Sequence, residues 1–254
     1  MKTEWDYTNL AQAYLLRPDY APSAISQMLA QAGVRPGDAA CDVGAGAAHL
    51  TLELAKFGLR VSAVEPNDAM RANGIKRTKQ YPQVQWFEGV GEHTGMQDNQ
   101  FELVTFGSSF NVCDRQMALT ETDRILKPGG YFACMWNHRD LDDPLQKEIE
   151  GIIQANIAGY TYGTRREDQT EVIAQSGLFG HVIFLQGTVR HQLNADDFIE
   201  GWKSHGTVYR QSPEVFEKII AEIRDLVHGL HQQTILVPYT TRIWMAQTKK
   251  GGSL

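Results

Sequence analysis

Short apolar stretches alternate with helical patterns between about residues 39 and 136, and this alternation limits the possible folds more than any other feature of the chain. The rhythm is typical of βαβ crossovers, which build a mostly parallel sheet with helices on both faces. We therefore predict an α/β fold with a doubly wound sheet. Its first five strands are expected at residues 39–44, 60–66, 84–89, 101–110 and 131–137, with helices at 48–58, 67–80 and 116–130.

Beyond residue 140 the regular alternation stops. Helical patterns dominate at 143–158 and 213–228, and an apolar run lies between them at 181–189. The last stretch, 234–249, is rich in β-branched and aromatic residues and is expected to return to the same sheet as a strand. A chain of 254 residues is long enough for one such domain and too short for two full-sized enzymes. We predict a single domain whose second half caps the site.

The charge balance disfavours nucleic-acid partners. Charged residues make up 21% of the chain, the net charge is -6 and the isoelectric point is about 5.7. Binding to nucleic-acid phosphates usually requires a surplus of basic residues, which this chain lacks. The expected partner is a small molecule, and a homodimer is left open.

Neither a metal site nor a membrane segment is expected. Cys41, Cys113 and Cys134 are far apart in apolar runs, which favours reduced core residues over disulfides or a zinc site, and no CxxC or HExxH pattern occurs. The N-terminal segment MKTEWDYTNLAQAY has no apolar signal core, and no apolar run is long enough to span a bilayer. We therefore expect a cytoplasmic location.

The segment CDVGAGAAHLT, residues 41–51, indicates a ligand-binding turn. Asp42 ends the first predicted strand, and Gly44 and Gly46 form a tight turn into a helix N-terminus, where backbone can pack against a ligand. The nicotinamide fingerprint GxGxxG would need a third glycine at position 49, where the chain has His49. A nicotinamide oxidoreductase is therefore disfavoured, although a GxG turn alone also occurs for packing reasons.

Three further signals accompany this turn. Glu65 stands at the tip of the second predicted strand, where a carboxylate can accept both hydroxyls of a ribose. The segments GVGEHTGMQDNQFELVTF and ILKPGGYF precede the fourth and fifth strands. With these features the chain resembles the class I S-adenosylmethionine-dependent methyltransferases, particularly the small-molecule branch that includes ubiquinone-type and trans-aconitate-type methyltransferases.

The resemblance implies a Rossmann-like, mostly parallel seven-stranded sheet with a helical cap and a single methyltransferase domain over 1–254. It implies a core at about 33–140 and 178–250, a lid at about 1–32, and cap elements at about 141–177 and 194–232. The cofactor would be S-adenosylmethionine, with S-adenosylhomocysteine as product. The segment YLLRPDYAP is similar to the family's Y…RPxYP segment, so Tyr14, Arg17 and Tyr20 are expected to lie over the cofactor.

The same resemblance assigns residues to parts of the cofactor. The turn around Gly44 would contact its methionine part, Glu65 its ribose, and Gly91 with Glu92 the side of its adenine ring, while Ser108 or Ser109 would lie near the transferring methyl group. The full expected set is Tyr14, Arg17, Asp42, Gly44, Ala45, Gly46, Glu65, Pro66, Asn67, Met70, Gly91, Glu92 and Ser108.

Two places depart from the family pattern. Ala47 and Ala48 stand where many relatives have Thr-Gly after the turn, which removes a hydroxyl group and adds a methyl group near the cofactor. Asn111 and Val112 stand where relatives often carry a His-Trp pair, so a base at that histidine cannot be transferred to this chain.

Methyl transfer from a sulfonium is an in-line displacement, so holding the reactants in line supplies most of the catalysis. A protein base is needed only for a hydroxyl or protonated amine nucleophile. His138 follows the fifth strand and is the candidate base, with ordering of the next loop as the alternative role. Arg139 is a candidate for a substrate carboxylate or phosphate, and pairing with Asp140, Asp142 or Asp143 is the alternative.

The cap contributes candidate substrate residues. Aromatic and cationic side chains gather in GYTYGTRRED and GWKSHGTVYR and suit a planar or anionic small molecule, although packing of amphipathic helices explains any single one equally well. The first cluster holds Tyr160, Tyr162, Arg165 and Arg166, and the second includes Trp202, His205, Tyr209 and Arg210. The proposed substrate set is Ser109, Arg139, Tyr162, Trp202, His205 and Tyr209.

These observations predict methyl transfer to a nitrogen, oxygen or carbon atom of a metabolite or natural-product intermediate. A macromolecule methyltransferase is disfavoured by the acidic balance and by the absence of an NPPY-type motif. A non-catalytic S-adenosylmethionine-binding relative that regulates a partner is the alternative, and Ala47 and Ala48 leave it open. The sequence does not identify the substrate, because the residues that determine specificity are expected in the cap.

Overall fold

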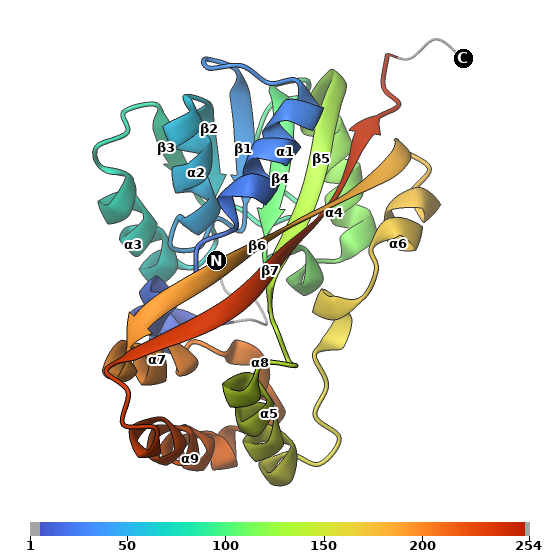
Figure 1. Cartoon of the computed structure of the whole chain (residues 1–254). Helices are drawn as coiled ribbons and strands as arrows, with labels where there is room; N and C mark the ends of the chain where they lie inside the picture. Colours follow the sequence, from blue (N-terminus) through green and yellow to red (C-terminus); the bar gives the residue numbers. More distant parts are fainter. Residues whose placement is uncertain (1–5, 252–254) are drawn as a thin grey trace.

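A computed structural model describes residues 6–251, and a seven-stranded sheet runs through the middle of this part (Figure 1). The strand order is β3-β2-β1-β4-β5-β7-β6. Neighbours from β3 to β5 pair in parallel, whereas β7 pairs antiparallel with both β5 and β6. The strands are β1 Ala39–Val43, β2 Arg60–Val64, β3 Val84–Phe87, β4 Phe101–Gly107, β5 Leu126–Arg139, β6 Phe179–Asn194 and β7 Thr234–Thr248. The predicted fold class is confirmed.

Helices cover both faces of the sheet (Figure 1). One face buries apolar residues of α1 and α2, and the other buries those of α4 and α6. The strands contribute alternate residues to the two faces because successive side chains point to opposite sides. The helices are α1 Pro22–Ala32, α2 His49–Phe57, α3 Asp68–Thr78, α4 Arg115–Ile125, α5 Pro144–Asn156, α6 Thr170–Gln175, α7 Ala195–Trp202, α8 Gly206–Gln211 and α9 Phe216–Gly229.

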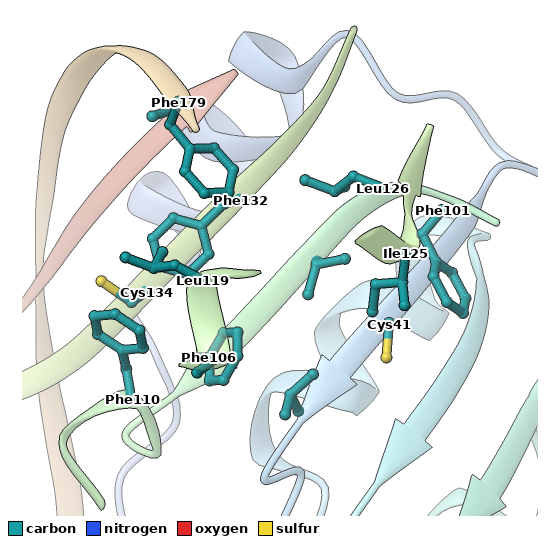
Figure 2. Close-up of a cluster of buried hydrophobic side chains, with 14 of the residues drawn as sticks. Cys41, Phe101, Phe106, Phe110, Leu119, Ile125, Leu126, Phe132, Cys134 and Phe179 are labelled. Atoms are coloured by element: carbon teal, nitrogen blue, oxygen red, sulfur yellow. The ribbon is translucent and has the colours of Figure 1, made fainter. Parts of the chain in front are cut away.

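A chain of phenylalanine rings fills the second of these faces (Figure 2). The ring centroids of Phe106 and Phe110 lie 5.4 Å apart, those of Phe110 and Phe132 5.3 Å, and those of Phe132 and Phe179 5.5 Å. Phe106, Phe110 and Phe132 are fully buried. Because β4, β5 and β6 each supply a ring, this cluster joins the parallel strands to the antiparallel edge.

Strands β6 and β7 extend past the parallel strands and end among the helices α5, α7 and α9 (Figure 1). Their pairing continues from Phe179 opposite Thr248 to Asn194 opposite Thr234. Near the second pair, Ile235 and Val237 pack with apolar residues of α5, α7 and α9 in a cluster of their own. These helices form the cap that was predicted for the second half of the chain.

Three details differ from the sequence predictions. Helix α1 belongs to the sheet layers and not to the lid, because its apolar face packs on the sheet. Helix α6 lies on α4 and β6 through the buried Ile173 and so stands outside the cap. Helix α4 ends at Ile125, before Pro128, because LKPGG already belongs to β5. The first five residues of the predicted lid lie outside the described residues.

Between residues 6 and 251, the structure contains no helix with the length and apolar character needed to cross a membrane.

Candidate functional site

Two neighbouring cavities open at the carboxyl ends of the parallel strands, where open α/β sheets bind their ligands. We name the first the Glu65 cavity, which encloses about 490 Å³. Its lining includes Glu65, Pro66, Met70, Val90, Gly91, Glu92, Ser109, Cys113 and Asp114. We name the second the arginine cavity, and its lining includes Arg17, Tyr20, Asp42, Ala45, His49, Arg139, Arg165, His191, Trp202, His205 and Tyr239. Both are lined by Tyr7, Tyr14, Gly44, Gly46, Gly107, Ser108 and Asn111.

The glycine turn forms the partition between the cavities. Gly44 and Gly46 have φ angles of 67° and 55°, in the left-handed region that glycine adopts without strain. A Cβ atom on Gly44 would lie 2.4 Å from the Cβ of Ser109, so no larger residue fits there. Val64 accepts the amide of Gly44 at 2.8 Å and fixes the turn against the end of β2. Glycine at position 44 therefore lets Ser109 pack directly against the turn.

Glu65 is held at the floor of its cavity with only 6% of its surface exposed. Its two carboxylate oxygens accept the amides of Gly46 and Asn67 at 2.8 and 2.9 Å. Burial raises the pKa of Glu65, and the two amides oppose that rise. Each oxygen keeps a lone pair, so the group can accept a pair of neighbouring hydroxyls.

Gly91, Glu92 and Cys113 form another wall of the Glu65 cavity. A Cβ atom on Gly91 would lie 2.5 Å from the sulfur of Cys113, so the absence of a side chain brings backbone up to the cavity. Glu92 accepts the amide of Asp114 at 2.6 Å and ties this wall to the start of α4. Together with Met70 on the other side, the wall suits a planar ring.

Asp42 lies on the other side of the partition, in the lining of the arginine cavity. It is buried, and Thr51 and Thr105 donate hydrogen bonds to it at 2.6 and 3.0 Å. Burial raises the pKa of Asp42 to about 6, against the opposing effect of these hydrogen bonds. The carboxylate therefore holds the ends of β1, α2 and β4 together beside the glycine turn.

Ser108 lies where the two cavities meet. Its φ angle of 60° is unusual for a residue with a side chain and indicates local strain, which tends to occur at functional sites. Its hydroxyl lies 3.0 Å from the hydroxyl of Tyr20. The neighbouring Ser109 donates to the carbonyl of Val43 at 2.5 Å and lines the Glu65 cavity, away from its predicted substrate position.

The N-terminal segment is fastened over the glycine turn by His49. The ring nitrogens of His49 lie 2.9 Å from the carboxylate of Asp19 and 3.1 Å from the carbonyl oxygen of Tyr14. The side chain of Tyr14 reaches both cavities, whereas Arg17 lines only the arginine cavity. The structure thus moves Arg17 from the predicted cofactor set to the opposite side of the partition.

Arg139 lies in the arginine cavity with its charge already compensated. Its guanidinium lies 3.0 Å from the amide oxygen of Gln146 and 3.3 Å from the carboxylate of Glu150. The guanidinium also lies 4.5 Å from the ring centroid of Trp202. The three neighbouring aspartates considered from the sequence are not its partners, because α5 brings Glu150 over the end of β5 instead.

Four predicted site residues lie outside the lining of both cavities. His138 points its Nε2 at the carbonyl oxygen of Arg165, at 3.1 Å, and burial together with neighbouring arginines lowers its pKa to about 3. This placement favours the ordering role over that of a base. Asn67 caps α3 by accepting the amide of Met70, Tyr162 donates to Glu150, and Tyr209 is exposed.

Several polar lining residues were not singled out from the sequence, among them His191, Tyr239 and Asp114. His191 and Tyr239 come from β6 and β7, and Asp114 precedes α4. His191 and Tyr239 lie on the antiparallel pair of β6 and β7, which no local sequence motif predicts. The alternation of half-buried and exposed residues along β6 is the signal that marks one of its sides as covered.

Part of the chain is similar in sequence to known methyltransferases. Residues 41–134 match a family model described as a methyltransferase domain. An uncharacterized methyltransferase of Mycobacterium bovis is 34% identical over 128 residues, which cover 49% of this chain and 48% of the relative. A demethylmenaquinone methyltransferase of Lysinibacillus sphaericus is 32% identical over 125 residues, 48% of this chain and 50% of the relative. The chain thus spans about half the length of the curated relatives it matches.

Solved structures show the same fold. The YcgJ protein of Bacillus subtilis superposes with a TM-score of 0.56 at 17% identity, covering 90% of this chain and 99% of that protein. Phosphoethanolamine N-methyltransferase 2 of Haemonchus contortus, in complex with S-adenosyl-L-methionine, superposes with a TM-score of 0.54 at 16% identity. The superposition covers 94% of this chain and 57% of that protein. The predicted resemblance to class I methyltransferases is confirmed for the sequence of residues 41–134 and for the fold.

Proposed function

We propose that this chain is an S-adenosylmethionine-dependent methyltransferase whose cofactor binds in the Glu65 cavity and whose small-molecule substrate binds in the arginine cavity. The observation that carries the proposal is the shared boundary of the two cavities at Gly44, Gly46 and Ser108. A transferring group on one side of this boundary is within reach of an acceptor on the other. The match of residues 41–134 to a methyltransferase domain supports this assignment.

The residues present fit S-adenosylmethionine. Glu65 offers two buried carboxylate oxygens to a ribose diol, and Gly44 and Gly46 line the same cavity with backbone. The backbone at Gly91 and the side chain of Met70 offer two apolar walls to an adenine ring. When bound, the cofactor supplies a methyl group on a positively charged sulfur.

The protein's main contribution is to hold the acceptor in line with that methyl group, since positioning alone removes much of the barrier of such a displacement. Tyr14 and Ser108 face both cavities, so they are placed to align the two molecules. The bond between Tyr20 and Ser108 keeps this junction rigid. Trp202, on the cap, lines the arginine cavity and holds His205 there, because the two rings stack with their centroids 4.0 Å apart.

His205 is placed to accept a hydrogen bond, and not a proton, from a hydroxyl group of the acceptor. Its Nδ1 lies 3.1 Å from the carbonyl oxygen of Trp202, and a carbonyl can only accept, so Nδ1 carries the hydrogen and Nε2 is an acceptor. Burial, together with Arg17, Arg139 and Arg165, lowers the pKa of His205 well below its ordinary value and keeps the ring neutral. His205 lines the arginine cavity, whereas His138 does not.

Calorimetric titration with S-adenosylmethionine and S-adenosylhomocysteine tests the cofactor assignment. We expect micromolar binding by the wild type and a loss of about a hundredfold in Glu65→Ala, because two hydrogen bonds to a charged group are removed. Glu148→Gln, an exposed acid on α5, is the matched control and should bind like the wild type. Failure of the wild type to bind either compound would contradict the proposal.

Turnover tests the catalytic part of the proposal. Incubation of the wild type with methyl-labelled S-adenosylmethionine and fractionated small molecules should transfer label to an acceptor, and His205→Asn should slow the transfer of label to hydroxyl acceptors. Tight cofactor binding with no transfer to any fraction would favour a non-catalytic, cofactor-binding protein.

A further inference from the structure

Three arginines line the arginine cavity, and they differ in how their charges are balanced. Arg139 has a counter-ion, because Glu150 lies 3.3 Å from its guanidinium and the pair is buried. It also has a neutral partner in Gln146. The protein itself therefore supplies Arg139 with a counter-ion and a hydrogen-bond partner, so no charged ligand is required to balance its charge.

Arg17 is fixed in place by neutral acceptors only. Its Nε donates to the hydroxyl of Ser204 at 3.0 Å, and one terminal nitrogen donates to the carbonyl oxygen of the same residue at 2.7 Å. Its guanidinium lies 4.5 Å from the ring centroid of Tyr14. Over residues 6–251 no carboxylate lies within ion-pair distance of Arg17, so its orientation is set while its charge stays uncompensated.

Arg165 has weaker hydrogen bonding than Arg17 among the described residues. Its Nε atom is buried and has no hydrogen-bond partner among the described residues. One terminal nitrogen lies 3.5 Å from the hydroxyl of Thr207, at the limit of a hydrogen bond, and no acid of the described chain pairs with it. Burial and the nearby charges of Arg17, Arg139 and Arg166 lower the pKa of Arg165 to about 10.

The remaining lining does not supply a counter-charge. Among the described residues around this cavity, Asp42 is the only acidic side chain, and it is bonded to Thr51 and Thr105 at the glycine turn. Arg17 and Arg165 are half-buried and lack a counter-ion among the described residues, and an anion with hydrogen-bond acceptors would supply one. Arginine forks match the two oxygens of a carboxylate or phosphate especially well.

We propose that the substrate carries a carboxylate or phosphate group that binds between the guanidinium groups of Arg17 and Arg165. This inference rests on the proposed function, since it places the acceptor of the methyl group in the arginine cavity. The anionic end lies on the cap side, because Arg165 belongs to the segment that follows α5. The rest of the substrate extends toward Ser108, with Trp202 and Tyr239 beside it.

Binding of three simple probes to the protein saturated with S-adenosylhomocysteine tests this inference by calorimetry. Benzoate and phenyl phosphate carry the two candidate groups, and benzamide has the shape of benzoate without its charge. We expect at least one of the anions to bind about tenfold or more tightly than benzamide, and the tighter of the two identifies the preferred group. Added chloride should weaken the binding of that anion.

Variants locate the site. Arg165→Gln and Arg17→Gln should each weaken binding of the preferred anion by about tenfold or more, because a charge-assisted hydrogen bond is lost. Arg190→Gln, which changes an exposed arginine on β6, should leave it unchanged. Affinity for S-adenosylhomocysteine should be unaltered in Arg165→Gln.

The outcomes separate the two proposals. Equal binding of benzoate, phenyl phosphate and benzamide by the wild type would overturn the anionic assignment, as would full retention of anion binding by Arg165→Gln. Neither result would affect the cofactor assignment, which depends on Glu65. If instead the wild type bound the anions but not S-adenosylhomocysteine, the proposed methyltransferase function would be refuted. The anion site between Arg17 and Arg165 would still be supported.

Discussion

The ring of His138 and the backbone of Arg165 are joined by a hydrogen bond of 3.1 Å between Nε2 and the carbonyl oxygen. The last residues of β5 thereby hold the segment that brings an arginine into the arginine cavity. Because Nε2 must donate to a carbonyl, Nδ1 is the unprotonated nitrogen, and it is buried without a partner. Protonation of this ring would place a charge beside several arginines.

Acidification should therefore destabilise the protein through His138. Its pKa falls from 6.5 to about 3 in the folded state, so the unfolded chain binds the proton first, and the stabilising contribution present above pH 6.5 is lost as the pH falls toward 3. Between pH 7 and 5 this costs roughly 2 kcal/mol of unfolding free energy. Urea titrations at the two pH values should show a smaller loss in His138→Gln. His181→Gln, at an exposed site, is the control and should show the same pH dependence of the unfolding free energy as the wild type. If His138→Gln lost as much stability between pH 7 and 5 as the wild type, His138 would not be the group responsible.

Replacement of the first glycine of the turn should damage both stability and cofactor binding. Gly44→Ala places a methyl group 2.4 Å from the Cβ of Ser109 at a positive φ, so we expect a loss of about 2 kcal/mol or more in unfolding free energy. Gly46→Ala meets the flexible end of Met70 at 3.1 Å and should cost less. Chemical denaturation measures both. Gly151→Ala, with open space around it in α5, should be neutral or stabilising, and equal effects at all three glycines would contradict this account.

The phenylalanine cluster should dominate the stability of the sheet. Phe132 is fully buried and contacts three other rings, so Phe132→Ala should lower the unfolding free energy by about 3–5 kcal/mol. Ile75→Ala, which truncates a half-exposed side chain on α3, should change it by less than about 0.5 kcal/mol. Thermal and urea unfolding provide the comparison. A small effect at Phe132 would mean that the cluster repacks around the gap.

The buried pair of Arg139 and Glu150 should show strong coupling. Glu150→Gln leaves Arg139 without its counter-ion, at a cost of about 3 kcal/mol of unfolding free energy, whereas Arg139→Met with Glu150→Leu should recover most of it. Glu148→Gln on the same helix serves as the control. A double-mutant cycle by urea unfolding measures the coupling, and additive losses would show that the pair is not a unit.

Local patterns were sufficient to predict the sheet core. The glycine turn after β1, the acid at the end of β2 and the LKPGG segment each combine chemistry with a short-range signal, and the structure places Gly44, Gly46 and Glu65 around one cavity. The predicted role of each residue stays a prediction until binding is measured. The end of α4 was misplaced because Pro128 can stand inside a strand at its exposed start.

The arginine cavity could not be predicted in the same way. Its lining combines residues of the N-terminal segment, β5, the loop before α6, α7 and the antiparallel pair, and no sequence spacing relates them. Arg139 was placed in the proposed substrate set from the sequence, and Arg165 was left out of it. The structure gives Arg139 a counter-ion, Glu150 on α5, and gives Arg165 none among the described residues. His138 was favoured because it follows a strand, but its side chain points toward Arg165 and away from the cavity.

The unbroken pairing of β6 with β7, from the edge of the parallel sheet into the cap, has a consequence for how such proteins diverge. Under the proposed function, one end of this ribbon belongs to the sheet beside the cofactor cavity, and the other end carries the cap helices beside the substrate cavity. Changes confined to α7 and α8, which line the arginine cavity, can therefore alter which substrate fits while the Glu65 cavity is unchanged. New specificities are expected to arise in this architecture by exchange of cap residues at constant reaction chemistry.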